Sequence, residues 1–169
     1  MTQTEKVLEA GTINPSSWTA PITTTRLIAG FGAGFLSVLI FSHGLLWILQ
    51  TAGVAVPLPA WSMMPVPPFG VPQTFSGAFF GGLWGVAYAM IEPRLTARFG
   101  WWAGGIVFGG ILPLVVLWFI VFPLKGIPVG GGFALVGAIR DFALHAIFGL
   151  GVAIFFRAGL RAGGRRVAS

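Results

Sequence analysis

Four long apolar runs constrain this chain more than any other feature. They cover about residues 27–50, 74–92, 103–122 and 133–156 of the 169. A bilayer core of about 30 Å is crossed by about 20 helical residues, so each run is long enough to span it. Backbone groups inside lipid must bond to one another, and the runs lack the two-residue alternation of barrel strands. We therefore predict an all-α polytopic integral membrane protein with four transmembrane helices.

Composition supports this fold class. Charged residues make up only 8% of the chain, against about 25% in a soluble domain. The absence of cysteine excludes disulfides, thiolate metal ligands and cysteine nucleophiles. The first 26 residues lack the residue order of a secretory signal. We divide the chain into an N-terminal arm at 1–26, a transmembrane domain at 27–157 with a proline-rich outer loop at 51–73, and a basic tail at 158–169.

The basic residues predict the orientation of the helices. Four spans place both termini and the connection between spans two and three on one side of the membrane. Because cytoplasmic segments are enriched in Lys and Arg, we expect both termini in the cytoplasm of a bacterial inner membrane. These basic residues also account for the high pI of the chain, and we expect them to contact lipid headgroups. The sequence shows no basic face on a folded soluble element that would indicate binding of a nucleic acid. The basic residues on that side are Lys6, Arg26, Arg94, Arg98, Arg157, Arg161, Arg165 and Arg166.

Glycines recur at four-residue spacing in the apolar runs. This spacing lets two membrane helices approach closely, so we predict that the glycines pack the helices into a tight four-helix bundle. Large aromatic side chains would then face lipid or neighbouring proteins. The glycines are Gly30, Gly34, Gly77, Gly81, Gly85, Gly105, Gly109, Gly137 and Gly149.

The loop at 51–73 contains half of the prolines, and these favour an extended chain. It also carries the large apolar residues Trp61, Met63, Met64 and Phe69, which are untypical of a solvated linker. Two interpretations follow. The loop is either a lid that lies over its own bundle at the membrane surface, or a docking surface for lipid or another subunit.

Ionisable side chains at membrane depth usually face the interior of a bundle. Here they are His43 in span one and Arg140, Asp141 and His145 in span four. We expect a charge-compensated polar cluster, in which the adjacent Arg140 and Asp141 point about 100° apart and Arg140 extends outward. His43 is expected to bond to Asp141 or to the proline-rich loop. A proton or ion pathway through the cluster is the alternative.

Two histidines also raise the question of a cofactor. Haem ligation in membrane cytochromes takes one histidine from each of two helices at nearly equal depth. The predicted depths of His43 and His145 differ by roughly 7 Å, which disfavours it. We predict no cofactor and no metal site, with haem b, or a chlorin held by one histidine, left as alternatives.

Pro93 is expected to end span two, because proline cannot continue the hydrogen-bond ladder of a helix. Just before it, Glu92 is expected to pair with Arg94 or Arg98 at the membrane surface, an interaction of about 1 kcal/mol or less.

The segments FSHGLLWILQTAG (41–53) and PVPPFGVPQTFSGAFFGGLWG (65–85) resemble a group of small four-helix inner-membrane proteins of proteobacteria. The resemblance covers spans one and two best. It implies four helices and a proline-rich outer loop, and it implies no function and no site residues.

Motifs of hydrolases, metalloproteases and nucleotide-binding loops are absent from the sequence, and its polar segments are too short to fold a catalytic domain. We therefore expect no enzyme. The leading hypothesis is a non-catalytic accessory subunit of a larger bacterial inner-membrane complex, such as a respiratory or photosynthetic one. The alternatives are a small homo-oligomeric channel or transporter that uses the polar cluster, and a single-haem electron carrier.

Overall fold

The computed structural model describes residues 21–56 and 58–167 and is mostly helical. Four helical segments are long and apolar enough to cross a membrane, which agrees with the predicted all-α class and its four spans. Residues 1–20 of the predicted arm lie outside the described residues. The four segments are Thr24–Thr51, Gln73–Phe99, Trp101–Leu124 and Leu135–Gly163.

Two of the four spans contain a π-helical turn. Span one consists of α2 (Thr24–Ser37), the π-helix η2 (Val38–Ser42) and α3 (His43–Thr51). Span three consists of α5 (Trp101–Val116), the π-helix η3 (Leu117–Val121) and α6 (Phe122–Leu124). Span two is the single helix α4 (Gln73–Phe99), and span four is α7 (Leu135–Val167), which follows the short 3-10 turn η4 (Val129–Phe133).

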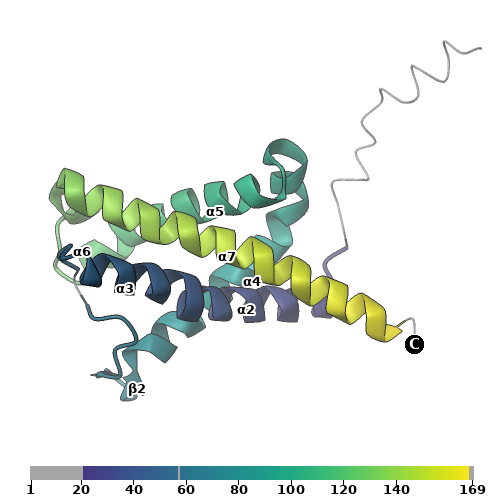
Figure 1. Ribbon diagram of the computed structural model, residues 1–169, viewed down its shortest axis with the longest axis horizontal. Helices are drawn as coiled ribbons and strands as arrows, with labels where there is room; N and C mark the ends of the chain where they lie inside the picture. Colours follow the sequence, from purple (N-terminus) through teal and green to yellow (C-terminus); the bar gives the residue numbers. More distant parts are fainter. Residues whose placement is uncertain (1–20, 57, 168–169) are drawn as a thin grey trace, which may run out of the picture.

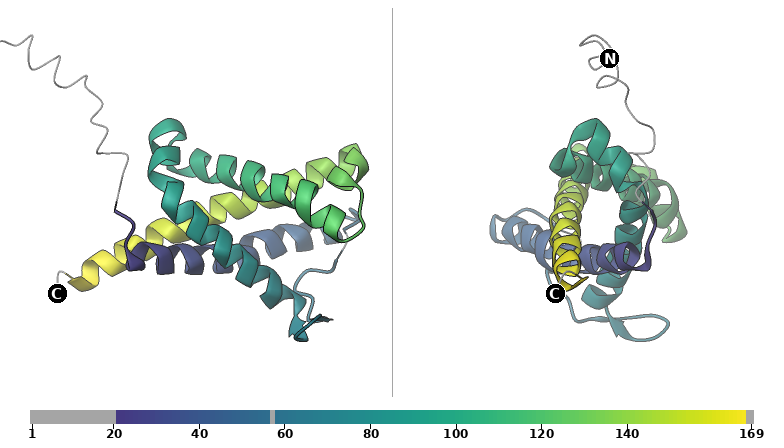
Figure 2. Two further views of the ribbon diagram at one scale, coloured as in Figure 1. Left: turned by 180° about the vertical axis from the view of Figure 1, so that it is seen from behind. Right: turned by 90° about the vertical axis from the view of Figure 1, so that its right-hand side faces the viewer.

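The spans form a ring in which each packs against two others (Figures 1 and 2). Helix α2 contacts α4 and α7, and α5 contacts the same two helices. We call the end of the bundle where α3, α6 and the β-hairpin lie the loop end (Figure 1). The opposite end, where α2 begins and α4 turns into α5 at Gly100, is the basic end. Among the described cations the basic end has Arg26, Arg94, Arg98, Arg157 and Arg161.

Helix α4 does not stop at Pro93, contrary to the sequence prediction, but continues through it to Phe99. Proline at this position leaves the carbonyl of Ala89, four residues earlier, without its usual helical donor. The structure supplies a replacement from span one, since Arg26 Nη2 donates to the Ala89 oxygen at 3.0 Å. The same guanidinium binds Glu92 at 3.1 Å. The predicted partner of Glu92, Arg94 or Arg98, was therefore wrong.

Close helix approach occurs through the glycines on two sides of the ring. On one side Gly30 and Gly34 of α2 lie against Gly81 and Gly85 of α4, and a Cβ added at Gly30 would lie 2.5 Å from the Gly85 oxygen. Such a distance is too short for any larger residue. These contacts follow the predicted four-residue spacing.

On the other side of the ring α5 meets α7. Gly105 and Gly109 lie against Gly149, and a Cβ added at Gly105 would lie 2.6 Å from the Gly149 oxygen. Gly77 and Gly137 do not take part, because the nearest atom to an added Cβ lies 3.9 Å away in each case. For these two the predicted packing role was wrong.

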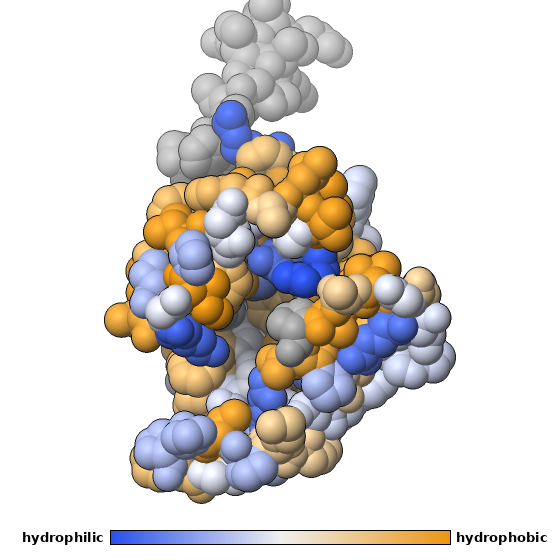
Figure 3. All heavy atoms as spheres, turned by 90° about the vertical axis from the view of Figure 1, so that its left-hand side faces the viewer, coloured by the Kyte–Doolittle hydropathy of each residue, from blue (hydrophilic) through white to orange (hydrophobic). Residues whose placement is uncertain are grey.

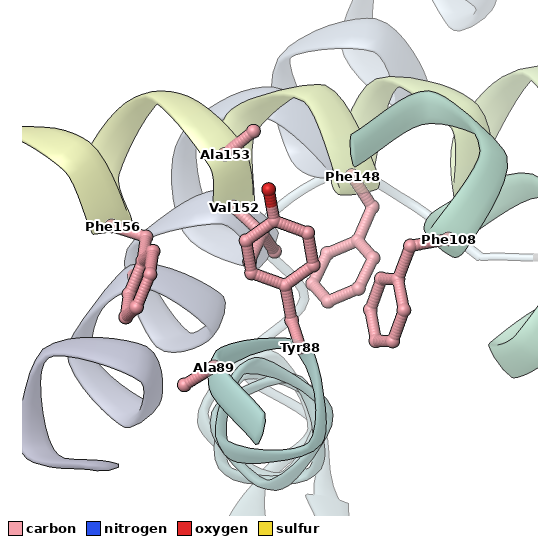
Figure 4. Close-up of a cluster of buried hydrophobic side chains, with 8 residues drawn as sticks. Tyr88, Ala89, Phe108, Phe148, Val152, Ala153 and Phe156 are labelled. Carbon is pink, nitrogen blue, oxygen red and sulfur yellow. The ribbon is translucent and has the colours of Figure 1, made fainter. Parts of the chain in front are cut away.

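The apolar core lies in the half of the bundle nearer the basic end. Tyr88 lies between the rings of Phe108 and Phe156, with edge-to-face centroid distances of 5.1 and 5.7 Å (Figure 4). Phe148 and Val152 of α7 complete the cluster. The loop-end half lacks an equivalent cluster of buried side chains among the described residues, and the candidate site lies there.

The connection between spans one and two ends in a small hairpin away from the bundle (Figures 1 and 2). Its strands β1 (Pro65–Val66) and β2 (Val71–Pro72) pair antiparallel, and Phe69 lies in the turn between them. The hairpin is fixed to the start of α4, because Thr74 donates through its amide and its hydroxyl to the Ser62 carbonyl at 3.1 and 2.8 Å.

Candidate functional site

A cavity of about 360 Å³ lies between the four spans on the loop-end side of the core. Every span contributes to its wall, and both histidines of the chain line it. The π-helical turns contribute Val38 and Ser42 on one side and Leu117 and Val121 on the other. π-helical turns often mark functional sites, and here both border the same cavity.

The cavity opens sideways because α4 diverges from its neighbours toward the loop end. No Cα of α4 lies within 8 Å of a Cα of α3, η3 or α6. Phe80 of α4 lines the cavity and is 60% exposed, so it lies at the opening. In a four-span membrane protein this side of the bundle faces lipid. Small molecules dissolved in the bilayer can therefore reach the cavity.

The hydrogen bond of His145 fixes its ring nitrogens. His145 Nδ1 lies 2.7 Å from the backbone oxygen of Asp141, one turn earlier in α7. A carbonyl oxygen can only accept, so Nδ1 carries the hydrogen and donates it. In the neutral ring Nε2 then has a free lone pair. No protein partner of Nε2 is seen, whereas every buried polar side-chain atom of the described residues has a hydrogen-bond partner. Nε2 is therefore not buried, and because His145 lines the cavity, this nitrogen is accessible from it.

His43 has the opposite arrangement. The backbone N–H of Trp61 donates to His43 Nδ1 at 3.0 Å, and the Trp61 ring stacks on the imidazole with a centroid distance of 6.0 Å. A nitrogen that accepts an N–H has no hydrogen of its own, so the hydrogen of the ring is on Nε2. Of the two partners expected for His43, the structure shows the proline-rich loop and not Asp141.

The π-helical turn explains why the loop attaches here. A π-helical turn breaks the regular pairing of carbonyls with donors four residues later. The carbonyl of Leu39 within η2 instead accepts the indole N–H of Trp61 at 2.9 Å. Trp61 has a positive φ of 51°, a backbone conformation that is unfavourable for a large side chain. Its two hydrogen bonds to span one offset this strain.

Arg140 and Asp141 form an ion pair near the histidines. Arg140 Nη2 lies 3.0 Å from Asp141 Oδ1, and the indole N–H of Trp118 donates to the other carboxylate oxygen at 3.2 Å. The pair agrees with the expected charge compensation: adjacent residues leave a helix about 100° apart, and the long arginine side chain folds back onto the aspartate. Arg140 also donates to the Ala55 carbonyl in the loop at 3.2 Å.

The four predicted polar residues are thus brought to one region but not into one cluster. Asp141 is joined to Arg140 by charge and to His145 through its backbone, whereas no bond joins His43 to this group among the described residues. On the loop-end surface, hydrophilic and hydrophobic side chains together surround a hollow (Figure 3). The cavity itself is mostly apolar, with Ser42, the two histidines and the Trp84 indole as its polar groups.

Haem ligation by both histidines does not fit this geometry. Both histidines line one cavity. An iron ligand must offer a lone pair, however, and His43 Nε2 carries a hydrogen as long as Nδ1 accepts from Trp61. The described residues also contain no group of three His, Asp or Glu side chains that could hold a metal ion.

Sequence reasoning missed two features of this region. Neither π-helical turn has a local signature in an apolar run. Ser37 was also missed, although it is fully buried and donates to the Phe148 carbonyl at 2.6 Å. A polar residue in the glycine-rich face of span one was the available signal, because such a side chain in a membrane helix needs a partner.

We find no match to this chain among protein-family models, curated proteins or solved structures.

Proposed function

We propose that this protein is a non-catalytic subunit of a larger assembly in a bacterial inner membrane, and that its hairpin docks on another integral membrane protein of that assembly. The observation that carries the proposal is the apolar hairpin held outside the bundle. Phe69, Met64 and Met63 are 86%, 62% and 59% exposed, although they lie beyond the ends of the spans and not along them. Large apolar side chains in such a place mark an interaction surface.

The hairpin is also held rigidly, which favours recognition of a partner. Hydrogen bonds join Ser62 to Thr74 at the start of α4, and Gln50 at the end of span one binds the Ala60 amide at 3.0 Å and the Leu58 carbonyl at 3.3 Å. A partner would therefore meet a surface that needs little further ordering.

The orientation in the membrane belongs to the same proposal. Most of the described lysines and arginines lie at the basic end of the bundle. In the loops of the opposite end, the described part of the chain has a single one, Lys125. The preference of Lys and Arg for the cytoplasmic side supports an orientation with both termini in the cytoplasm and the hairpin outside it.

A channel through a single copy is less well supported. The polar side chains of the predicted pathway lie in the loop-end half of the bundle. The apolar core of Tyr88, Phe108 and Phe156 fills the other half. An ion path would have to cross this core or run between copies.

Site-specific photocrosslinking in native membranes tests the proposal. A photoreactive amino acid at Phe69 should yield one discrete adduct with another membrane protein. The matched control is Leu124, which is also at the loop end and 82% exposed but lies outside the hairpin. Leu124 should give no such adduct.

A second measurement distinguishes docking from a lid that lies on lipid. Phe69→Ser should convert the native complex to the free protein on a native gel without lowering the melting temperature, whereas Leu124→Ser should leave the complex intact. Adducts of Phe69 with lipid alone, or wild-type protein that migrates only as a monomer or a self-oligomer, would contradict the proposal.

A further inference from the structure

We propose that the cavity between the four spans binds a membrane-soluble molecule with a hydroxylated ring as its head, held by the Nε2 atoms of His43 and His145. The inference does not depend on whether the hairpin docks on a partner. It rests on the hydrogen-bonding states of the two histidines, the aromatic wall of the cavity and its opening toward lipid.

The two histidines offer complementary hydrogen-bonding groups to the same space. His43 accepts at Nδ1 from Trp61 and so presents an Nε2–H donor, whereas His145 donates from Nδ1 to the Asp141 carbonyl and so presents an Nε2 acceptor. A hydroxyl accepts from one and donates to the other, and a ring with two hydroxyls can use one for each histidine. A carbonyl or an ether oxygen can serve only His43.

Helix α7 brings His145 to the same cavity as His43. It packs against both η2 and α3, the elements that meet at His43. Both rings are fixed by hydrogen bonds to backbone atoms, so the two groups are preorganised before a ligand binds.

The remaining wall favours a flat ring over a polar or flexible head. Phe80, Trp84 and Phe148 line the cavity together with aliphatic side chains. A volume of about 360 Å³ is at the lower end of the range of small-molecule sites and is sufficient for one substituted ring. An apolar tail can extend through the lateral opening beside α4 into the bilayer.

Binding of a decyl-substituted benzoquinol and of its dimethyl ether to the full chain in lipid nanodiscs, under argon, tests the proposal. Quenching of tryptophan fluorescence reports binding because Trp84 lines the cavity, and empty nanodiscs correct for partition into lipid. The quinol should bind saturably. Its ether, which has the same ring but no hydroxyl hydrogen, should bind roughly tenfold more weakly because His145 Nε2 is left without a donor.

Two variants separate the two contacts. His145→Leu should weaken binding of the quinol roughly tenfold and leave that of the ether unchanged. His43→Asn retains an acceptor for the Trp61 amide but removes the Nε2 donor, so it should weaken binding of both compounds. Trp47→Leu is the control, since Trp47 is on α3 but outside the cavity wall and is 53% exposed.

The proposal would be overturned by equal affinity of the unchanged protein for the quinol and its ether. Absence of saturable binding above empty nanodiscs would also overturn it. If a histidine variant does not fold, the ratio of the two affinities in the unchanged protein still decides.

Discussion

At the scale of single residues, Arg26 shows how a side chain of one span repairs a backbone defect in another. Pro93 removes the donor for the Ala89 carbonyl, and the Arg26 guanidinium replaces it while it binds Glu92. The guanidinium also lies over the ring of Phe156 at 5.1 Å. One cation therefore joins the start of span one to spans two and four.

Arg26→Met should lower the free energy of unfolding by about 1–3 kcal/mol, because the Ala89 carbonyl and the Glu92 carboxylate each lose a donor. In a Pro93→Ala background the loss should be smaller by about 1 kcal/mol, since residue 93 then donates to Ala89 itself. Unfolding of the four proteins of this cycle in mixed micelles measures the coupling.

Arg94→Met is the matched control, since Arg94 is exposed at the same end of the bundle and its side chain makes no hydrogen bond, ion pair or cation–π contact with the described residues. It should change stability by less than about 0.5 kcal/mol. Strictly additive effects of Arg26→Met and Pro93→Ala would contradict the account of the helix through Pro93.

At the scale of the helices, glycines determine how closely the spans pack. Gly34 is a sharp case, because a Cβ added there would collide with the backbone of Gly81 and lie 2.8 Å from its carbonyl carbon. Gly34→Ala should destabilise the protein by about 1–3 kcal/mol, since two helix backbones would have to move apart. Thermal unfolding in detergent measures the change.

Gly32 is a matched control on the same helix. An added Cβ at Gly32 has no neighbour within 4 Å. Gly32→Ala should leave stability unchanged or raise it by up to about 1 kcal/mol, because alanine favours the helix over glycine. Similar losses for the two variants would show that the glycines act through helix propensity and not through packing.

The helices and most of their packing faces could be predicted from the sequence, because apolar length and four-residue spacing are local properties of the chain. Gly77 and Gly137 show the limit of this reasoning, since they have the spacing but no backbone of another helix in close contact. The path of α4 through Pro93 could not be predicted, since it depends on Arg26 from another span.

The candidate site could be predicted only in part. Sequence reasoning selected His43 and His145 as rare polar groups at membrane depth. Their hydrogen-bonding states depend on Trp61, which is 18 positions from His43 and reaches it through a loop fold and a π-helical turn. No pattern in the sequence indicates that arrangement.

At the scale of the whole molecule, the account depends on four spans that cross a bilayer and leave two chemically different ends. The hairpin lies at one end of the bundle (Figure 1), and most of the described cations belong to the elements of the other end. The lateral opening of the cavity faces hydrocarbon only if this arrangement in the membrane is correct. The proposed docking surface and the proposed ligand site both follow from it.

Labelling of single cysteines in intact cells with a membrane-impermeant maleimide tests this arrangement most directly, because the chain has no cysteine of its own. We predict that cysteines at the exposed positions Met64 and Lys125 react from outside, and that cysteines at Arg98 and Arg161 react only after the cells are opened. Reaction of Met64 and Lys125 from opposite sides, or of Arg161 from the same side as Lys125, would contradict the account.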